Sequence, residues 1–254
     1  MTSTLIVLAH PEQRSFNATW AAATRRACER TGHTVLWSDL VAMGFDPVES
    51  ARHYVEHQTD TPFDALKAQE QGAQDQKLPL DVASEIAKLQ QADRVIFHFP
   101  IWWFAPPAVL KGWFDRVLAH GALHNVGRRF DNGDFRWRKA LFCVTTGSTE
   151  AESSFKGKEG DIQMLLWPAA YTLRYLGFSV LVPQIVHGVH GYHRDERKAA
   201  MNMRLQSALD GQDALVAGFD NLPLMEFNAD SDFDQNGQLK PDSPSHTAFI
   251  RHDP

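Results

Sequence analysis

The chain has 254 residues, of which 43% are hydrophobic, and its formal net charge is −6. A chain of this length can bury a complete hydrophobic core, and the negative charge argues against a nucleic-acid partner. The two cysteines, Cys28 and Cys143, have no CxxC partner, which argues against a disulfide framework or a cysteine-based zinc site. No signal peptide is visible, and the longest apolar stretch, 95–110, is too short to span a membrane. We therefore expect a cytoplasmic protein without stable membrane insertion.

Strand and helix patterns alternate along the chain. Five apolar runs predict strands, at residues 4–9, 33–37, 94–99, 139–145 and 178–183. Helical patterns occur between and after them, at residues 15–30, 79–91, 107–118, 161–176 and 195–219. Strands joined by helical crossovers form parallel sheets. We therefore predict an α/β fold of the flavodoxin-like, doubly wound type, with five parallel strands in the order 2-1-3-4-5.

Two segments do not fit this alternation. Residues 42–78 are polar and interrupted, which predicts a long excursion with short helices. Residues 220–254 contain proline, aspartate, serine and asparagine without a clear period, which predicts an extended C-terminal tail and not a second domain. The predicted organisation is thus one domain over residues 1–219, followed by an extension over 220–254.

The segment after the third predicted strand is the most informative one for function. Pro100 ends the apolar run, and Ile101, Trp102, Trp103 and Phe104 come before the next helix. A loop after a parallel strand normally lies at the ligand-binding edge of the sheet. Consecutive aromatic residues there favour the binding of a flat ligand, with a flavin ring as the leading candidate. A core or subunit-interface role for the same aromatics stays open.

Polar residues follow two other strands. After the first strand come His10, Ser15, Phe16 and Asn17, where a helix begins and its free N–H groups can bind an anion. Ser15 can equally be an ordinary N-cap, and the absence of GxGxxG does not support a Rossmann dinucleotide turn. The fourth strand ends in the small polar residues Thr145, Thr146, Gly147 and Ser148. The three loops should converge, offering sites for phosphate, for a ring face and for a polar ring edge.

At this point the chain resembles the FAD-dependent NAD(P)H:quinone oxidoreductases of the DT-diaphorase family. The resemblance is firmest over residues 4–185. It is carried by the stretches 8–10, 15–17, 99–104, 110–117, 145–147, 160–161, 166–168, 177–178 and 182–184. Leu-Lys-Gly-Trp-Phe at 110–114 and Leu-Trp-Pro at 166–168 are its most specific parts.

The resemblance implies the following roles. His10, Ser15, Phe16 and Asn17 hold the pyrophosphate and ribityl parts of FAD. Pro100, Ile101, Trp102, Trp103 and Phe104 line the flavin ring, with Trp102, Trp103 and Phe104 bounding the hydride-transfer pocket. Thr145, Thr146, Gly147 and Ser148 border its polar edge, and Arg197 contacts the adenine end. The implied activity is two-electron, ping-pong reduction of quinones by NAD(P)H in a homodimer whose partner completes each pocket, with the tail packing on that partner.

The chain also departs from this family. The spacing after Thr145-Thr146-Gly147 places Ser153 and Glu159 where the family has a tyrosine and a histidine near the flavin. We treat both as candidate catalytic positions, although quinone preference is then open. An ammonium group of Lys156 or Lys158, preferably Lys158, is expected to assist flavin reduction in their place, and the alternative that both are solvated surface charges stays open.

Other signals and alternatives carry less weight. His187, His190 and His193 lack the spacing of a zincin helix, and the loop starting at Asp232 lacks the twelfth-position glutamate of an EF-hand, so no metal site is predicted. Alternative functions are an azo, nitro or FMN reductase of the same fold, or a regulatory flavoprotein subunit of a potassium-efflux transporter.

Overall fold

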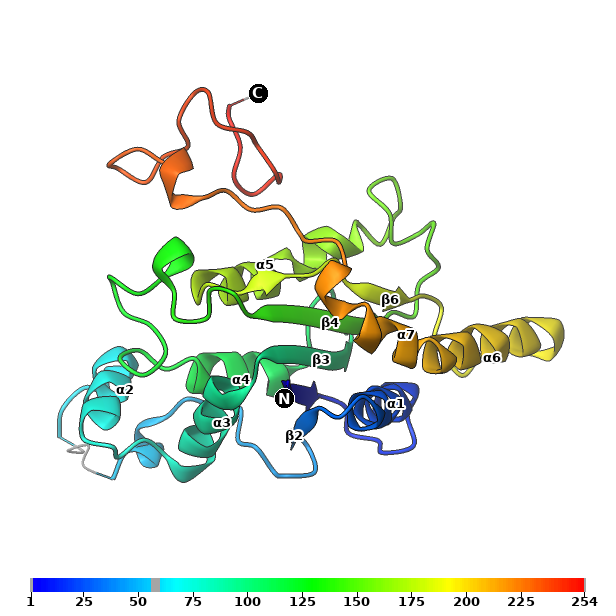
Figure 1. The fold of residues 1–254 in the computed structure, drawn as a ribbon, viewed down its shortest axis with the longest axis horizontal. Helices are drawn as coiled ribbons and strands as arrows, with labels where there is room; N and C mark the ends of the chain where they lie inside the picture. Colours follow the sequence, from blue (N-terminus) through cyan, green and yellow to red (C-terminus); the bar gives the residue numbers. More distant parts are fainter. Residues whose placement is uncertain (1, 56–59, 254) are drawn as a thin grey trace.

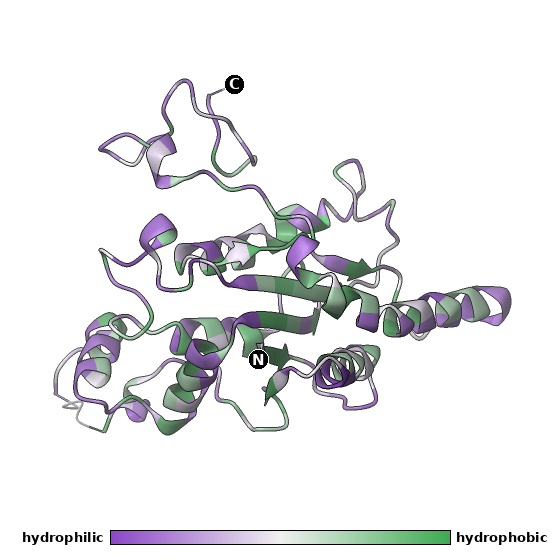
Figure 2. Ribbon diagram, viewed as in Figure 1, coloured by the Kyte–Doolittle hydropathy of each residue, from purple (hydrophilic) through white to green (hydrophobic). Residues whose placement is uncertain are grey.

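The computed structural model describes residues 2–55 and 60–253. Four parallel strands form its centre, β1 (Ser3–Leu8), β2 (Thr34–Asp39), β3 (Arg94–Pro100) and β4 (Lys139–Thr145). The sheet order is β2-β1-β3-β4-β5, which confirms the predicted doubly wound arrangement (Figure 1). β1, β3 and β4 are buried almost throughout because helices cover both faces of the sheet. Figure 2 shows this as hydrophobic colouring concentrated in the central strands.

The position of the fifth strand is filled by two short strands. β5 (Ser179–Val180) and β6 (Gln184–Val186) both pair with β4, at opposite ends of it. Pro183, which lies between them, has no N–H to give to the ladder. The preceding Val182 instead donates its N–H to the carbonyl of Pro223, at 2.8 Å. The single strand predicted at 178–183 was therefore wrong in its extent.

Helices pack on the two faces according to the alternation of strand side chains. Val95, Phe97 and Phe99 of β3 face one helical layer, and Ile96 faces the other. The helices are α1 (Phe16–Arg30), α2 (Ala65–Gln74), α3 (Leu80–Gln91), α4 (Ala108–Val117), α5 (Ile162–Tyr175), α6 (Asp195–Asp210) and α7 (Gln212–Ala217). α3, α4 and α5 share the first layer, while α1 and α7 share the second.

The last predicted helix, 195–219, is divided in the structure. α6 ends at Asp210, Gly211 follows, and α7 starts at Gln212. Glycine is a poor helix former, and the break turns Val216 into the core, where it is 3% exposed. α6 buries only Met201 and projects from the body of the molecule (Figure 1). None of the helices in the described ranges is long and apolar enough to cross a membrane.

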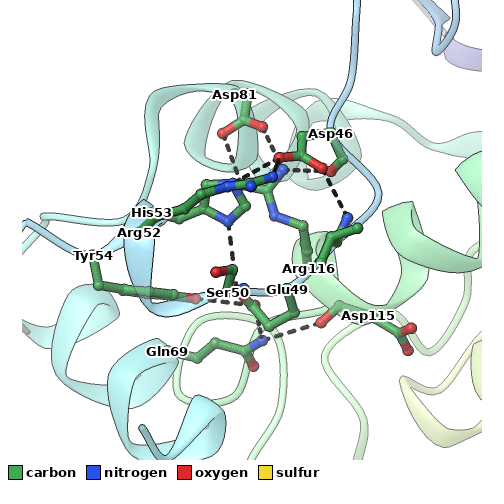
Figure 3. A network of polar contacts seen from close by, with 11 residues as sticks. Asp46, Glu49, Ser50, Arg52, His53, Tyr54, Gln69, Asp81, Asp115 and Arg116 are labelled. Carbon is green, nitrogen blue, oxygen red and sulfur yellow. Dashed lines mark hydrogen bonds and ion pairs between the residues drawn. The ribbon is translucent and has the colours of Figure 1, made fainter. Parts of the chain in front are cut away.

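The excursion after β2 is anchored by a buried arginine (Figure 3). As predicted, this excursion contains short helices, η1 (Ala51–His53) and α2; its residues 56–59 lie outside the described part. Arg116 of α4 is 1% exposed and donates to both carboxylate oxygens of Asp81, at 2.6 and 3.2 Å, and to the carbonyl of Asp46, at 2.7 Å. Gln69 of α2 donates to Glu49, at 2.9 Å. These contacts join the excursion to α3 and α4.

The C-terminal segment runs along α5 and then outward (Figure 1). It contains two short 3-10 helices, η3 (Phe219–Asn221) and η4 (Asp230–Asp232). Phe249 stacks on Trp167 of α5, with ring centroids 4.5 Å apart, and Phe227 contacts Tyr171. The segment is thus held to the domain through aromatic contacts on one helix.

Candidate functional site

Three loops meet at the carboxyl edge of the sheet, as the sequence predicts. They follow β1, β3 and β4, which are neighbours in the sheet. The amide of Asn17 donates to the Thr145 hydroxyl, at 2.8 Å, and so joins the first loop to the third. The N–H of Ile101 donates to the carbonyl of Thr145, also at 2.8 Å, and joins the second loop to the third. This edge is where ligands bind in open α/β sheets.

The first loop leads into the N-terminus of α1. Ser15 is its N-cap, and its hydroxyl accepts from the N–H of Ala18, at 3.2 Å. Asn17 is 3% exposed, and its side-chain oxygen has no hydrogen-bond partner among the described residues. No acidic residue occupies the first turn, so the positive end of the helix is unopposed there. The ring of His10 contacts that of Trp102 edge-on, at 5.6 Å, and partial burial lowers its pKa.

The second loop presents aromatic side chains from a strained turn. Trp102 and Ala105 exchange backbone hydrogen bonds of 3.0 and 3.2 Å, and the residues between them, Trp103 and Phe104, have φ values of +50° and +62°. Positive φ at both central positions characterises a type I′ turn, which favours glycine and asparagine, not aromatics. The three aromatics are nevertheless 45%, 93% and 52% exposed. They are therefore not core residues of the isolated chain.

The third loop supplies a row of hydroxyl groups. The Thr146 hydroxyl lies 2.7 Å from that of Ser148, which in turn bonds the hydroxyl of Ser153. Ser153 is 4% exposed, so this candidate position is a buried end of the row. Gly147 has no atom within 4 Å of the place where a Cβ would lie. A ligand can therefore approach the backbone here without steric hindrance.

A cleft of about 410 Å³ lies between the aromatic turn and the hydroxyl row. Its lining residues are Ile101, Trp103, Phe104, Thr146, Gly147, Ser148, Glu152, Ser153, Glu159, Ile162 and Leu165. The structure thus brings all four candidate catalytic residues together with most of the predicted ring-binding ones. Sequence reasoning missed Glu152, which precedes Ser153 directly, as well as Ile162 and Leu165 from the start of α5.

The charges beside the cleft are arranged differently from the expectation. Lys158 forms an ion pair with Glu152, at 3.1 Å, and is 74% exposed through its side chain. The Thr149 N–H and the Lys158 ammonium hold the pKa of Glu152 below its usual value. The ammonium of Lys156 lies 5.4 Å from the ring of Phe155. Neither lysine lines the cleft, so the expected dependence of flavin reduction on them stays a prediction with little geometric support.

Arg197 is not brought together with the other candidates. It lies exposed in the first turn of α6, and within the described chain its side chain makes no hydrogen bond or ion pair. It does not line the cleft, so its role at an adenine end stays a prediction. Among residues 2–55 and 60–253, no three histidine, cysteine, aspartate or glutamate side chains gather as a metal site.

A second, larger hollow adjoins the cleft. It measures about 950 Å³ and runs between α4 and α5. Its lining is mainly apolar and includes Phe104, Phe114, Trp167, Tyr171 and Tyr175. Phe104 lines both hollows, so the aromatic turn separates the cleft from this groove.

Comparisons with known proteins give a consistent result. The model of a family with a flavodoxin-like fold matches residues 2–209. Over 211 residues the chain is 38% identical to NAD(P)H dehydrogenase (quinone) 1 of Cavia porcellus, covering 81% of this chain and 77% of that protein. It is 38% identical to ribosyldihydronicotinamide dehydrogenase (quinone) of Pongo abelii, covering 80% and 90%. A crystal structure from Klebsiella pneumoniae, provisionally assigned as a quinone reductase, has a TM-score of 0.83 at 27% identity and 95% coverage of both chains.

Proposed function

The chain belongs to the flavodoxin-like family of NAD(P)H dehydrogenases (quinone), and we propose that it reduces quinones with NAD(P)H, using FAD as its cofactor. The resemblance read from the sequence is thereby confirmed at the level of the family. One observation carries the proposal for the site: the loops after β3 and β4 line a cleft with an aromatic wall and a hydroxyl wall, and Asn17 joins the loop after β1 to them through Thr145. Such a combination suits a planar ring with a polar edge.

The residues of the cleft fit a flavin. In this proposal His10, Ser15, Phe16 and Asn17 hold the phosphate and ribityl parts, and the unpartnered oxygen of Asn17 accepts from a ligand hydroxyl. Pro100, Ile101, Trp102, Trp103 and Phe104 cover the ring face, while Thr145, Thr146, Gly147 and Ser148 meet its polar edge. Arg197 is assigned to the adenine half. When bound, FAD supplies the two-electron chemistry that couples NAD(P)H to the quinone.

The chain's own side chains supply positioning and exclusion of water. Trp103 and Phe104 form an apolar wall against which a nicotinamide or quinone ring can lie. Ser153 sits at the buried end of the hydroxyl row, where its hydroxyl can hold that of Ser148, and through it that of Thr146, in position for a ligand. Glu159 contributes a carboxylate to the same cleft. These four residues, Trp103, Phe104, Ser153 and Glu159, are our candidates for catalysis.

The assembly is proposed to be a homodimer. The apolar groove between α4 and α5 supports this, because a two-fold interface over it would remove the apolar lining of both copies from water. The extension over 220–254 buries only Asn228 among its described residues and is assigned to the partner's surface, beside a catalytic domain over 1–219. A cytoplasmic location is supported by the two cysteines, which are free and buried, as is usual in a reducing compartment.

The test uses the purified protein. We expect a flavin absorption spectrum, FAD as the mass of the released cofactor, and NAD(P)H oxidation that depends on an added benzoquinone. Parallel assays with an azo dye, a nitroarene and free FMN examine the alternative reductase functions. Turnover of one of these acceptors in preference to every quinone, or stoichiometric FMN in place of FAD, would contradict the proposal.

A further inference from the structure

The charged residues that line the cleft are all acidic. Among its lining residues are two carboxylates, Glu152 and Glu159, and no basic side chain. Glu152 is compensated by the ion pair with Lys158 and by hydrogen bonds from the N–H and hydroxyl of Thr149. The Glu159 carboxylate has no hydrogen bond or ion pair with any described residue. The cleft is therefore lined by one carboxylate that no hydrogen bond or ion pair neutralises and that the Lys158 ammonium reaches only through a longer-range charge interaction.

The backbone holds Glu159 in this place. Its N–H donates to the carbonyl of Glu152, at 3.0 Å, and the N–H of Gly160 donates to the carbonyl of Gly157, at 3.1 Å. A Cβ at Gly157 would come within 2.0 Å of the Glu152 carbonyl oxygen, so only glycine permits this close turn. The loop thus holds the backbones of Glu152 and Glu159 together, while Lys158 forms its ion pair with Glu152 and acts on Glu159 only at longer range.

We propose that Glu159 makes the acceptor site selective for uncharged or cationic quinones over anionic ones. The inference rests on the proposed function and concerns which acceptors the same site takes. An anionic group bound about 6 Å from Glu159, at an effective dielectric constant of about 40, loses roughly tenfold in affinity. The opposite wall strengthens the preference, because the faces of Trp103 and Phe104 attract cations.

The test compares one ring in two charge states, 1,4-naphthoquinone and its 2-sulfonate. The quantity of interest is the ratio of their kcat/KM values, compared between proteins, so that their different reduction potentials cancel. Glu159→Gln should shift this ratio about 5- to 20-fold toward the sulfonate. Glu196→Gln removes the same charge from the exposed first turn of α6 and should change the ratio less than twofold.

Two further measurements do not depend on turnover by the variant. Equilibrium binding of both quinones to the oxidised holoenzyme without donor, followed by tryptophan fluorescence, should show the same shift in the ratio of Kd values. In the wild type, raising NaCl from about 0.05 to about 0.5 M should reduce the preference for naphthoquinone over its sulfonate, because salt screens the repulsion between Glu159 and the sulfonate. Ratios that are equal in wild type and Glu159→Gln, or independent of salt, overturn the inference. Failure of the wild type to reduce naphthoquinone at all overturns the proposed function instead.

Discussion

Two polar regions of the molecule differ in how their charges are paired. In the network around Arg116 of α4, Arg116 is matched by Asp81, and Asp46 is matched by Arg52 and His53 (Figure 3). At the candidate site, Glu159 forms no ion pair with a described residue, and the side-chain oxygen of Asn17, in the neighbouring loop, is buried without a hydrogen bond. One region is therefore completed by the chain itself, and the other is left for a ligand to complete.

The backbone conformations of the two regions differ in the same way. The Asp46 carboxylate is held by the Val48 N–H, with Arg52 beside it, which keeps its pKa well below the usual range. At the cleft, Trp103 and Phe104 sit in left-handed conformations that aromatic residues disfavour. Strain combined with exposure is expected where a binding surface is held ready for its ligand. We therefore expect changes in the network around Arg116 to affect stability, and changes at the cleft to affect binding.

The largest effect is expected from removing the buried guanidinium. Arg116→Ala leaves Asp81 and the Asp46 carbonyl without their donor, and should lower the free energy of unfolding by about 3–5 kcal/mol. Lys111→Ala, on the same helix, removes an exposed ion pair with Asp115 and should cost less than about 1 kcal/mol. Urea unfolding of both variants measures the difference. Equal losses would show that the network does not stabilise the excursion.

His98 gives the next largest effect, as a pH dependence. It is fully buried on β3, its side chain hydrogen-bonds only Thr24, at 3.1 Å, among the described residues, and burial lowers its pKa from 6.5 to about 3. Between these values the unfolded chain binds a proton that the folded chain excludes, so stability falls as pH falls from about 6.5 toward 3. From pH 6.5 to 5 the wild type should lose about 1.5 kcal/mol more than His98→Gln. If the free energy of unfolding of the two proteins changed with pH in parallel, His98 would not be the source of the pH dependence.

Asn17→Ala tests the link between the first and third loops. It removes the bond to Thr145 and the unpartnered oxygen together, so stability should fall by only about 1 kcal/mol. Affinity for FAD should fall roughly tenfold, the equivalent of one lost hydrogen bond to ligand. Thr19→Ala, which removes a hydroxyl bond to the Ser15 carbonyl on the exposed side of α1, is the control. Titration of each flavin-free variant with FAD measures the affinity. Equal affinities of Asn17→Ala and Thr19→Ala for FAD would contradict the prediction.

Trp103→Gly should give the smallest change in stability, with the opposite sign. Glycine relieves the left-handed strain, worth about 1–2 kcal/mol, but loses more backbone entropy on folding, so a net gain of ~0.5–1 kcal/mol is expected. Quinone kcat/KM should fall about tenfold, because the wall that orients the ring is lost. Denaturant unfolding and steady-state assays on one preparation suffice. A Trp103→Gly variant that is less stable than the wild type and fully active would contradict the view that this turn is strained in order to bind a ligand.

The sequence predicted the architecture well because the strands are buried on both faces and read as continuous apolar runs. β3 and β4 illustrate this, as their bounds differ from the predicted ones by at most one residue. The extent of the fifth strand and the break in the last helix escaped prediction. Pro183 and Gly211 were visible, but whether a strand or helix continues past such a residue depends on tertiary contacts, here of Val182 and Val216.

For the site, spacing along the chain identified which loops meet but not which side chains pair. Lys158 was expected to act at the ring as the neighbour of Glu159, yet its ammonium reaches back to Glu152. That choice follows from the tight turn at Gly157, which no local pattern predicts. The left-handed turn at Trp103 and Phe104 was equally hidden, because its residue types argue against the turn that they adopt.

The identity of the bound cofactor and its reaction test the central claim most directly. The purified protein is to be denatured, the released flavin identified by mass, and the native sample mixed anaerobically with NAD(P)H and then with a quinone. We predict one FAD per chain, bleaching of its absorbance by NAD(P)H, and return of that absorbance on addition of one equivalent of benzoquinone. A protein that binds no flavin, or whose reduced flavin is not reoxidised by the quinone, would contradict the account.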